Sequence, residues 1–426
     1  MLQSDRDDVK FKFLHAADLH LDSPLLGLAG KSSDYAARVE RASRGAFENL
    51  INLAIAEGCS FVVLAGDVFD GDLRNFETGL FFIEQMRKLD QAGIRVFLIL
   101  GNHDAENRFA SKLTLSANVH LFHHQRAESV AIDELAVTLH GRSFPQRDVT
   151  ENIAREYPSP VAGHFNIGVL HTACQGNEDG HALYAPCTLE QLINHGYDYW
   201  ALGHVHGRVV LNEDPYIVYP GNLQGRNSRE TGPKGATLIE VVDGRVSSLL
   251  HHDLDVVRWV QMEVDTSEAG SRTALLDEVR SCVHQACNLA GDRGLAIRVR
   301  LTGVTSQHDK LLLDQPALKD DVVALAAAVA ADVWLEKLQI ATTAPTDIEA
   351  DDPTVSGRLI SEIEQAAGSD RIAKLVEAKL AEVRGKMPAG AHSEALFEVL
   401  RAETPLKAQS LALSLLKDSE AQDAAH

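Results

Sequence analysis

Five short apolar segments in the first half of the sequence are each followed by side chains that bind metal ions or carry protons. The segments are Phe11–Ala16, Ser60–Ala65, Arg95–Leu100, Asn166–Leu170 and Asp198–Leu202. The polar residues that follow them are, in chain order, Asp18, His20, Asp67, Asn102, His103, His171, His204 and His206. Compact apolar runs of this kind are typical of buried strands. Because ligands of open α/β sheets bind where the strands end, the pattern predicts one shared site.

The spacing of these residues suits metal coordination. In an extended chain, residues i and i+2 point to the same side, so Asp18 and His20 are expected to hold one ion together. His204 and His206 have the same spacing. Either pair alone is a weak signal, since a single His-x-His is more often an ordinary surface or core feature.

The remaining residues divide into ligands and one side chain for proton transfer. Asn102 and His103 are adjacent and diverge, so Asn102 can face a metal while His103 faces a substrate. The two oxygens of Asp67 can bridge two ions. A set of nitrogen and oxygen ligands without thiolate suits two ions of Mn, Fe or Zn that activate a shared water for attack on phosphorus. The predicted ligands are Asp18, His20, Asp67, Asn102, His171, His204 and His206.

Helical patterns separate the five strands and define the first domain. They lie at about residues 34–57, 75–92, 105–116 and 188–195, the first with Ser33 or Asp34 as its N-cap. Strands that alternate with helices predict an α/β domain.

The second half of the sequence predicts a smaller unit and a tail. Val256–Val264, Leu295–Thr302 and Trp334–Ala341 resemble strands, with helices at about 270–289 and 309–331 between them. An acidic linker at 342–353 and helical patterns at 354–385, 391–403 and 405–418 follow. The predicted division is therefore 1–250, 251–345 and 346–426.

The order of the polar blocks resembles a known family. Asp-x-His, Gly-Asp-x-x-Asp, Gly-Asn-His-Asp, His and Gly-His-x-His occur in sequence from Asp18 to His206. They are similar to the blocks of the calcineurin-like metallophosphoesterases. Leu14–Leu25, Tyr197–His206 and Tyr219–Asn222 further resemble the bacterial SbcD-type DNA repair exonucleases. The resemblance covers about residues 11–245, and it implies a two-sheet sandwich flanked by helices, a small α+β cap domain and a helical C-terminal tail.

This resemblance implies a metal-dependent phosphodiesterase, most simply a DNA exonuclease. It assigns Asp18, His20, Asp67 and His206 to one metal, and Asp67, Asn102, His171 and His204 to the other. His103 would stabilise the transition state or protonate the leaving oxygen. The archaeal and eukaryotic repair nucleases of the family carry a second active-site histidine at the position of Asp70. His103 could therefore lack that support here.

Two sets of arginines are candidates for holding substrate phosphates. Arg38, Arg41 and Arg44 occur at i, i+3 and i+6 on the first predicted helix, and Arg226 and Arg229 follow the Tyr219–Asn222 block. Either set could position a strand without reading bases. Solvated helix and loop arginines explain each set equally well.

Composition limits the class of protein. The chain has 426 residues and a formal net charge of −21, which argues against nucleic-acid binding through the overall field but not through one local site. Its five cysteines form no Cys-x-x-Cys pair and fit a reducing compartment. The polar start of the sequence and the short apolar run at 322–331 predict a cytoplasmic protein without a membrane span.

The family also implies partners: DNA as substrate, a separately encoded SbcC-like coiled-coil ATPase docked by the tail, and a homodimer. Two divalent ions are expected as cofactors, Mn²⁺ first and Fe or Zn²⁺ as alternatives. Two other functions stay open at this stage. One is a phosphodiesterase for small cyclic or linear nucleotides, and the other is a subunit that mainly binds the ATPase.

Overall fold

The computed structural model describes residues 9–23, 41–70, 76–105, 114–174 and 184–344, with parts of 362–404. Arg38, the predicted N-caps Ser33 and Asp34, and most of the predicted linker and tail lie outside the described residues. The chain divides into two compact units. The first comprises residues up to Gln261 together with Ala286–Ile297 and Asp332–Glu336, and the second comprises the rest.

The first sheet has the strand order β12-β11-β1-β2-β3-β4. Strands β1 to β4 run parallel, β11 is antiparallel to β1, and β12 is antiparallel to β11. Their bounds are β1 Lys10–Ala16, β2 Phe61–Ala65, β3 Arg95–Ile99, β4 Val119–Leu121, β11 Gly235–Val242 and β12 Arg245–Asp253. The predicted domain boundary at residue 250 falls inside β12.

The second sheet has the order β5-β6-β7-β8-β10-β9. Strands β6, β7, β8 and β10 run parallel, while β5 and β9 are antiparallel edge strands. Their bounds are β5 Glu128–Ile132, β6 Val137–Gly141, β7 Phe165–His171, β8 Tyr199–Gly203, β9 Val209–Glu213 and β10 Tyr216–Tyr219. Two six-stranded sheets confirm the predicted sandwich.

An apolar core fills the space between the two sheets. Phe61 and Val63 of β2 belong to the same buried cluster as Ile167 of β7. The ring of Phe13 stacks on Phe61 with centroids 4.9 Å apart and meets Tyr199 edge-on at 5.4 Å. The Phe13–Tyr199 pair joins β1 of the first sheet to β8 of the second, and contacts of this kind hold the two sheets face to face.

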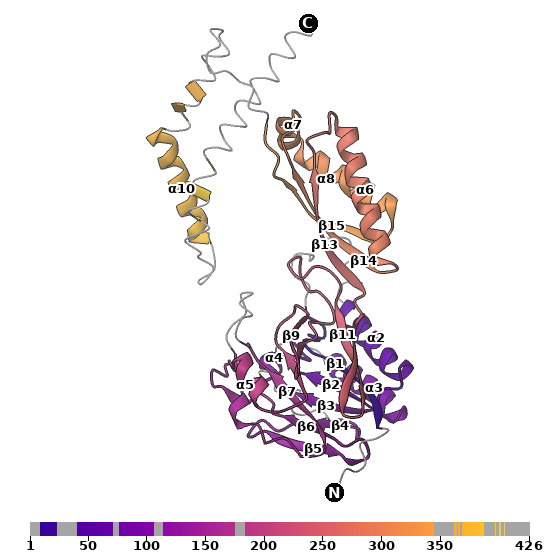
Figure 1. Ribbon diagram of the computed structural model, residues 1–426. Helices are drawn as coiled ribbons and strands as arrows, with labels where there is room; N and C mark the ends of the chain where they lie inside the picture. The colour runs from indigo at the N-terminus through magenta and orange to yellow at the C-terminus, as the bar shows by residue number, and fades with distance from the viewer. Residues whose placement is uncertain are drawn as a thin grey trace. The chain divides into compact units, whose positions relative to one another are not determined.

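Helices cover the outer faces. Val62 and Leu64 alternate with the core residues of β2 and pack instead in a cluster with Phe47 and Phe82. Those two residues come from α2 (Ala42–Ala56) and α3 (Phe76–Gln91), which Figure 1 shows beside the first sheet. Short helices cover the second sheet: α5 (Leu189–Asn194) and the 3₁₀ helix η3 (Ile153–Glu156). Two more, α4 (Asn102–Ala105) and η2 (Asp133–Leu135), lie in connections.

The following region has the predicted β-α-β-α-β order. Strands β13 (Val257–Asp265), β14 (Gly294–Thr302) and β15 (Val333–Ile340) form a third sheet in that order. Helix α6 (Arg272–Ala290) follows β13. The single helix expected at 309–331 is two, α7 (His308–Leu313) and α8 (Gln315–Val329), because Pro316 sits in the first turn of α8. Within the tail, α10 spans Asp370–Lys386. None of the described helices is long and apolar enough to cross a bilayer.

Candidate metal centre

The two sheets bring the carboxyl ends of five strands to one place. Asp18 and His20 follow β1, Asp67 follows β2, and Asn102 and His103 begin α4 directly after β3. From the second sheet, His171 ends β7 and His204 and His206 follow β8. The sequence therefore predicted the positions of these residues correctly. Parallel strands deliver their next residues to a common edge, as expected.

The conformation of the loops differs from the one expected. Asp18, His20, Asp67 and His204 all have positive φ, at 52°, 43°, 53° and 103°. Asp18 and His20 therefore converge through left-handed turns, and the assumption of an extended chain was wrong. Non-glycine residues with positive φ are strained, and strained residues of this kind are found mostly at functional sites.

Backbone hydrogen bonds tie the first two loops together. The N–H of Asp18 donates to the carbonyl of Gly66 at 3.0 Å, and that of His20 donates to the carbonyl of Asp67 at 3.0 Å. Gly101 allows the third loop to approach, since a Cβ there would lie 2.2 Å from Asp67 Oδ1. The loops are thus fixed by the backbone as well as by their side chains.

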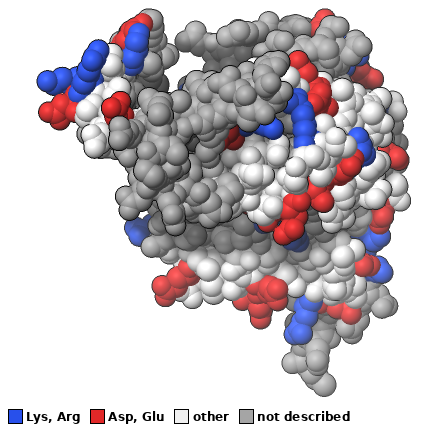
Figure 2. All heavy atoms as spheres, turned by 90° about the horizontal axis from the view of Figure 1, so that it is seen from above, with Lys and Arg blue, Asp and Glu red and all other residues white. Residues whose placement is uncertain are grey.

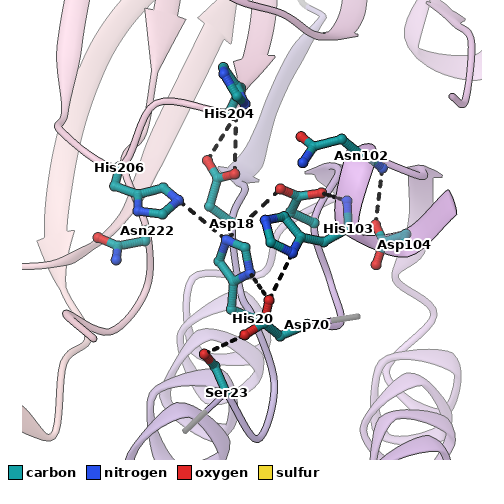
Figure 3. A network of polar contacts seen from close by, with 12 residues as sticks. Asp18, His20, Ser23, Asp70, Asn102, His103, Asp104, His204, His206 and Asn222 are labelled. Atoms are coloured by element: carbon teal, nitrogen blue, oxygen red, sulfur yellow. Dashed lines mark hydrogen bonds and ion pairs between the residues drawn. The ribbon is translucent and has the colours of Figure 1, made fainter. Parts of the chain in front are cut away.

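Three groups of side-chain atoms are close enough to share a cation. They are Asp18, His20 and His206, then His20, Asp67 and His103, and finally Asp18, Asp67 and His171. His20 Nε2 is 3.2 Å from His206 Nε2, and His171 Nε2 is 3.4 Å from Asp67 Oδ2. Asn102 Oδ1 lies 3.1 Å from His171 Nε2. Figure 3 shows the His20 and His206 rings facing each other and the Asp18 carboxylate directed toward His204.

His204 has a different position. Its backbone N–H donates to both Asp18 oxygens, at 3.1 and 3.0 Å. Its ring meets that of His171 edge-on at 5.3 Å and that of Tyr184 at 5.6 Å. None of the three groups of convergent ligand atoms found in the described residues includes His204. Its role as a ligand stays a prediction, while its backbone orients Asp18.

The chemistry of the cluster suits divalent cations. Asp18 and Asp67 are carboxylates exposed by only 1% and 2%, and buried carboxylates need compensating charge. The two imidazole nitrogens of His20 and His206 face each other at 3.2 Å, where a cation can bind both lone pairs. Nitrogen and oxygen donors without thiolate fit Mn, Fe or Zn.

Burial and charge shape the protonation of the site. Burial is the largest influence on Asp67, but the nearby His171 and His20 outweigh it and hold the pKa of its carboxyl well below the usual range. Burial alone would lower the pKa of His171, yet Asp67 and Asp18 raise it to about 9. Burial lowers the pKa of His20 to about 3, which leaves this imidazole in the neutral form that binds metals.

His103 has a carboxylate partner. His103 Nδ1 is 2.8 Å from Asp70 Oδ1, and Ser23 Oγ donates to Asp70 Oδ2 at 2.6 Å. The hydrogen bond with Asp70 is the main cause that raises the pKa of His103, against the opposing effect of burial. Asp70 therefore provides, through its carboxylate, the support that His103 could have lacked.

Two further carboxylates, Asp104 and Glu230, build the site although neither was among the predicted site residues. Asp104 is 1% exposed and accepts N–H bonds from Val68 at 3.1 Å, Phe69 at 2.8 Å and Gly101 at 3.0 Å. Burial raises the pKa of Asp104 to about 7. Glu230 Oε1 lies 3.1 Å from His206 Nδ1. Asp104 closes the Gly-Asn-His-Asp block, whereas nothing in the spacing of Glu230 links it to the site.

A cleft of about 760 Å³ opens beside the cluster. It is lined by the site residues Asp67, Asn102, His103, His204 and His206, and by the basic residues Arg147, Arg226, Arg229 and Lys234. Both arginines predicted after the Tyr219–Asn222 block therefore face the space next to the ligands. Arg147 and Lys234 join them without having been predicted.

The other predicted arginines lie differently. Arg44 Nε and Nη2 donate to the Asp22 carboxylate at 2.7 and 2.5 Å, and its guanidinium lies 5.2 Å from the centre of the Phe81 ring. Arg41 is exposed and precedes the described start of α2 at Ala42. Neither lines the cleft. These contacts do not support a phosphate-binding role for Arg44, because its charge is paired with Asp22.

Family models match two parts of the chain. The family model for calcineurin-like phosphoesterases matches residues 11–208, and a model described as the middle domain of metallophosphoesterase YhaO matches residues 259–343. Residues 11–208 are therefore similar to the calcineurin-like phosphoesterases.

Individual relatives share part of the chain. An uncharacterized metallophosphoesterase YhaO of Bacillus subtilis is 38% identical over 271 residues, covering 63% of this chain and 66% of that protein. The DNA double-strand break repair protein Mre11 of Methanopyrus kandleri is 26% identical, covering 55% and 51%. That of Aeropyrum pernix is 23% identical, covering 95% and 88%. The chain thus spans just under two thirds of the Bacillus subtilis relative and about half of the Methanopyrus kandleri relative. The SbcD-type branch stays a prediction.

Proposed function

We propose that the protein is a metal-dependent phosphodiesterase that acts on DNA, as an exonuclease or repair nuclease. The observation that carries this proposal is the convergence of Asp18, His20, Asp67, His171 and His206 beside a cleft with basic walls. Similarity to proteins named for DNA double-strand break repair supports DNA as the substrate class.

Two divalent ions fit the cluster, with Mn²⁺ expected first. Asp18, His20, Asp67 and His206 would hold one, and Asp67, Asn102, His171 and His204 the other. Ions bound there would supply Lewis-acid activation of a phosphoryl group and of water. The convergence of Asp18, His20 and His206 supports the first assignment. Asp67 Oδ2 lies 3.9 Å from His20 Nε2 and 3.4 Å from His171 Nε2, a position from which this carboxylate could serve both ions.

The chain's own residues would orient the substrate and move a proton. His103 lines the cleft, where it could protonate the leaving oxygen or stabilise the transition state. Asp70 holds the His103 ring by its Nδ1 atom, which leaves Nε2 for the substrate. Arg226 and Arg229 would hold backbone phosphates, a contact that positions a strand without reading its sequence.

A nuclease assay tests the proposal. End-labelled duplex and single-stranded DNA should be degraded in Mn²⁺, and His103→Ala should remove at least 99% of this activity, about 2.7 kcal/mol of barrier, while metal content stays near two ions per chain. Bis-p-nitrophenyl phosphate and cyclic nucleotides serve as comparison substrates. Faster turnover of cyclic nucleotides than of DNA would point to the small-nucleotide alternative, and near-full activity of the variant would contradict the role of His103.

We also propose that an SbcC-like coiled-coil ATPase binds the tail. No described residue of α10 is buried, and Leu375 is 53% exposed. A pull-down with the full chain, compared with one ending near residue 345, tests this proposal. Equal capture of the ATPase by both would contradict tail docking.

A further inference from the structure

Residues 222–230, which follow β10, are organised by one half-buried carboxylate, that of Glu230. Glu230 Oε1 lies 3.1 Å from His206 Nδ1 and accepts a hydrogen bond from Asn227 Nδ2 at 2.9 Å. Its Oε2 accepts from Asn222 Nδ2 at 2.6 Å and from the N–H of Arg226 at 2.9 Å. The Glu230 side chain is 13% exposed. Each of its oxygens therefore meets two donors, and both oxygens act only as acceptors.

These contacts determine the orientation of one predicted ligand. With Nδ1 of His206 held by Glu230, Nε2 is the nitrogen left to face His20, 3.2 Å away. The His206 carbonyl is held as well, by Lys234 Nζ at 3.1 Å and by the N–H of Asn222 at 3.3 Å. A carboxylate on the second nitrogen of a metal-binding histidine fixes the tautomer and the ring plane, and it makes the ligand more basic.

The same carboxylate places a basic residue in the cleft. Because the N–H of Arg226 is bound to Glu230, the Arg226 guanidinium reaches back to within 3.7 Å of Asp70 Oδ2. Asp70 in turn contacts His103. Glu230 thus lies behind both a ligand and an arginine that lines the cleft.

We propose that Glu230 is a positioning residue that orients His206 for a divalent cation in the Asp18, His20 and His206 group, while cation binding around His171 does not depend on it. The inference rests on the proposed function, because it assumes that this cluster holds metal. It assigns a role to a residue that the sequence pattern did not single out.

Substitution by glutamine is a sharp perturbation of these contacts. A glutamine side chain keeps the size of glutamate, but one of its two polar atoms is a donor. In one orientation of the amide, its NH₂ group faces His206 and Asn227. In the other orientation, it faces the N–H donors of Asn222 and Arg226. Glu128 offers a matched control on the edge strand β5. Its Oε1 lies 3.3 Å from His120 Nε2 and accepts from the N–H of His123 at 3.0 Å.

Titration of the metal-free full-length chain with Mn²⁺, followed by calorimetry, tests the proposal. The unsubstituted chain should bind two ions. Glu230→Gln should weaken one of the two sites by about 10–100-fold and leave the other unchanged, and Glu128→Gln should leave both unchanged. Adding Glu230→Gln to His206→Ala should cause no further loss at the affected site, because Glu230 acts through that ring.

The outcomes distinguish a failure of the proposed metal centre from a failure of the proposed role of Glu230. An unsubstituted chain that binds no pair of ions would contradict the proposed metal centre itself. Two ions bound as tightly by Glu230→Gln as by the unsubstituted chain would overturn the role of Glu230 alone. Equal weakening of both sites would indicate a general structural role and would also overturn it. If Glu230→Gln does not fold, Glu230→Asp, which keeps two acceptor oxygens on a shorter side chain, should show the same site-selective loss.

Discussion

The contact between His103 and Asp70 links a predicted catalytic residue to a neighbour whose role the sequence left open. Asp70 contacts four polar groups at once: His103 Nδ1 at 2.8 Å, Ser23 Oγ at 2.6 Å, His20 Nδ1 at 3.6 Å and Arg226 Nη1 at 3.7 Å. A carboxylate in this position stabilises the protonated imidazole. A general acid must be protonated when it acts, so the pH range of activity should depend on Asp70.

Asp70→Asn should move the alkaline limb of the pH–kcat profile to lower pH. The carboxylate raises the pKa of His103 above its ordinary value, so removing its charge lowers that pKa and the protonated form is lost at a lower pH. The measurement is kcat for Mn²⁺-dependent cleavage across pH 6 to 10. Ser23→Ala, which removes one hydrogen bond but leaves the carboxylate charge, is the control and should shift the limb far less.

Metal content must be measured in both variants, because Asp70 Oδ1 also lies 3.6 Å from His20 Nδ1. An unchanged alkaline limb in Asp70→Asn with two ions bound would show that His103 does not act as the acid.

At the scale of elements, the site depends on how closely three loops approach. The loops after β1 and β2 are joined by backbone hydrogen bonds. The loop after β3 packs against Asp67 at Gly101, which has no side chain. Asp67 Oδ1 accepts the N–H of His103 at 2.9 Å. A change of a few tenths of an ångström in the third loop would therefore move both a predicted ligand and the predicted acid.

Gly101→Ala should disable the enzyme more than it destabilises the fold. The added Cβ would lie 2.2 Å from Asp67 Oδ1 and 2.7 Å from the Asp67 nitrogen, so the loop or the carboxylate must shift. Overpacking of this kind costs about 1–3 kcal/mol of unfolding free energy, and a misplaced ligand lowers kcat about 100-fold. The measurements are kcat and thermal unfolding. Gly270→Ala is the control, since a Cβ there meets nothing within 4 Å; equal kcat in the two variants would contradict the argument.

The strands that carry the site were predictable because each is a compact apolar run. All five residues of β2 and of β8 are buried, as strands between two layers must be. The edge strands were missed for the opposite reason. Arg245–Asp253 (β12) mixes exposed and half-buried residues and contains no apolar run of that kind, and β4 has three residues.

The ligands were predictable for a related reason, whereas their supporting residues were not. A ligand that follows a strand is located by the strand, so Asp18 and Asp67 could be found from local patterns. Glu230 reaches His206 only because residues 222–230 fold back on it. A contact between residues 24 apart in sequence has no local signal. The left-handed turns at Asp18 and His20 were likewise invisible to the i, i+2 argument.

At the scale of the whole molecule, the formal charge of −21 opposes nucleic-acid binding through the overall field. On the described surface seen in Figure 2, acidic and basic side chains are interspersed. The basic residues that line the cleft, Arg147, Arg226, Arg229 and Lys234, stand beside the carboxylates Asp67 and Glu230. Two divalent ions would add four positive charges to this cleft, so they should determine whether a phosphodiester is held.

DNA binding should therefore require metal. His103→Ala, which is expected to keep both ions without cleaving, should bind a short duplex in Mn²⁺ at 50 mM salt, and a chelator should weaken binding at least tenfold, about 1.4 kcal/mol. Anisotropy of a labelled duplex, measured over a salt series, checks this. Adding Arg229→Ala should reduce the slope of log K against log salt by about one, because one phosphate contact is lost. Adding Arg44→Ala should leave the slope unchanged, since Arg44 is bound to Asp22. Equally tight binding without metal would show that a surface away from this cleft holds the DNA.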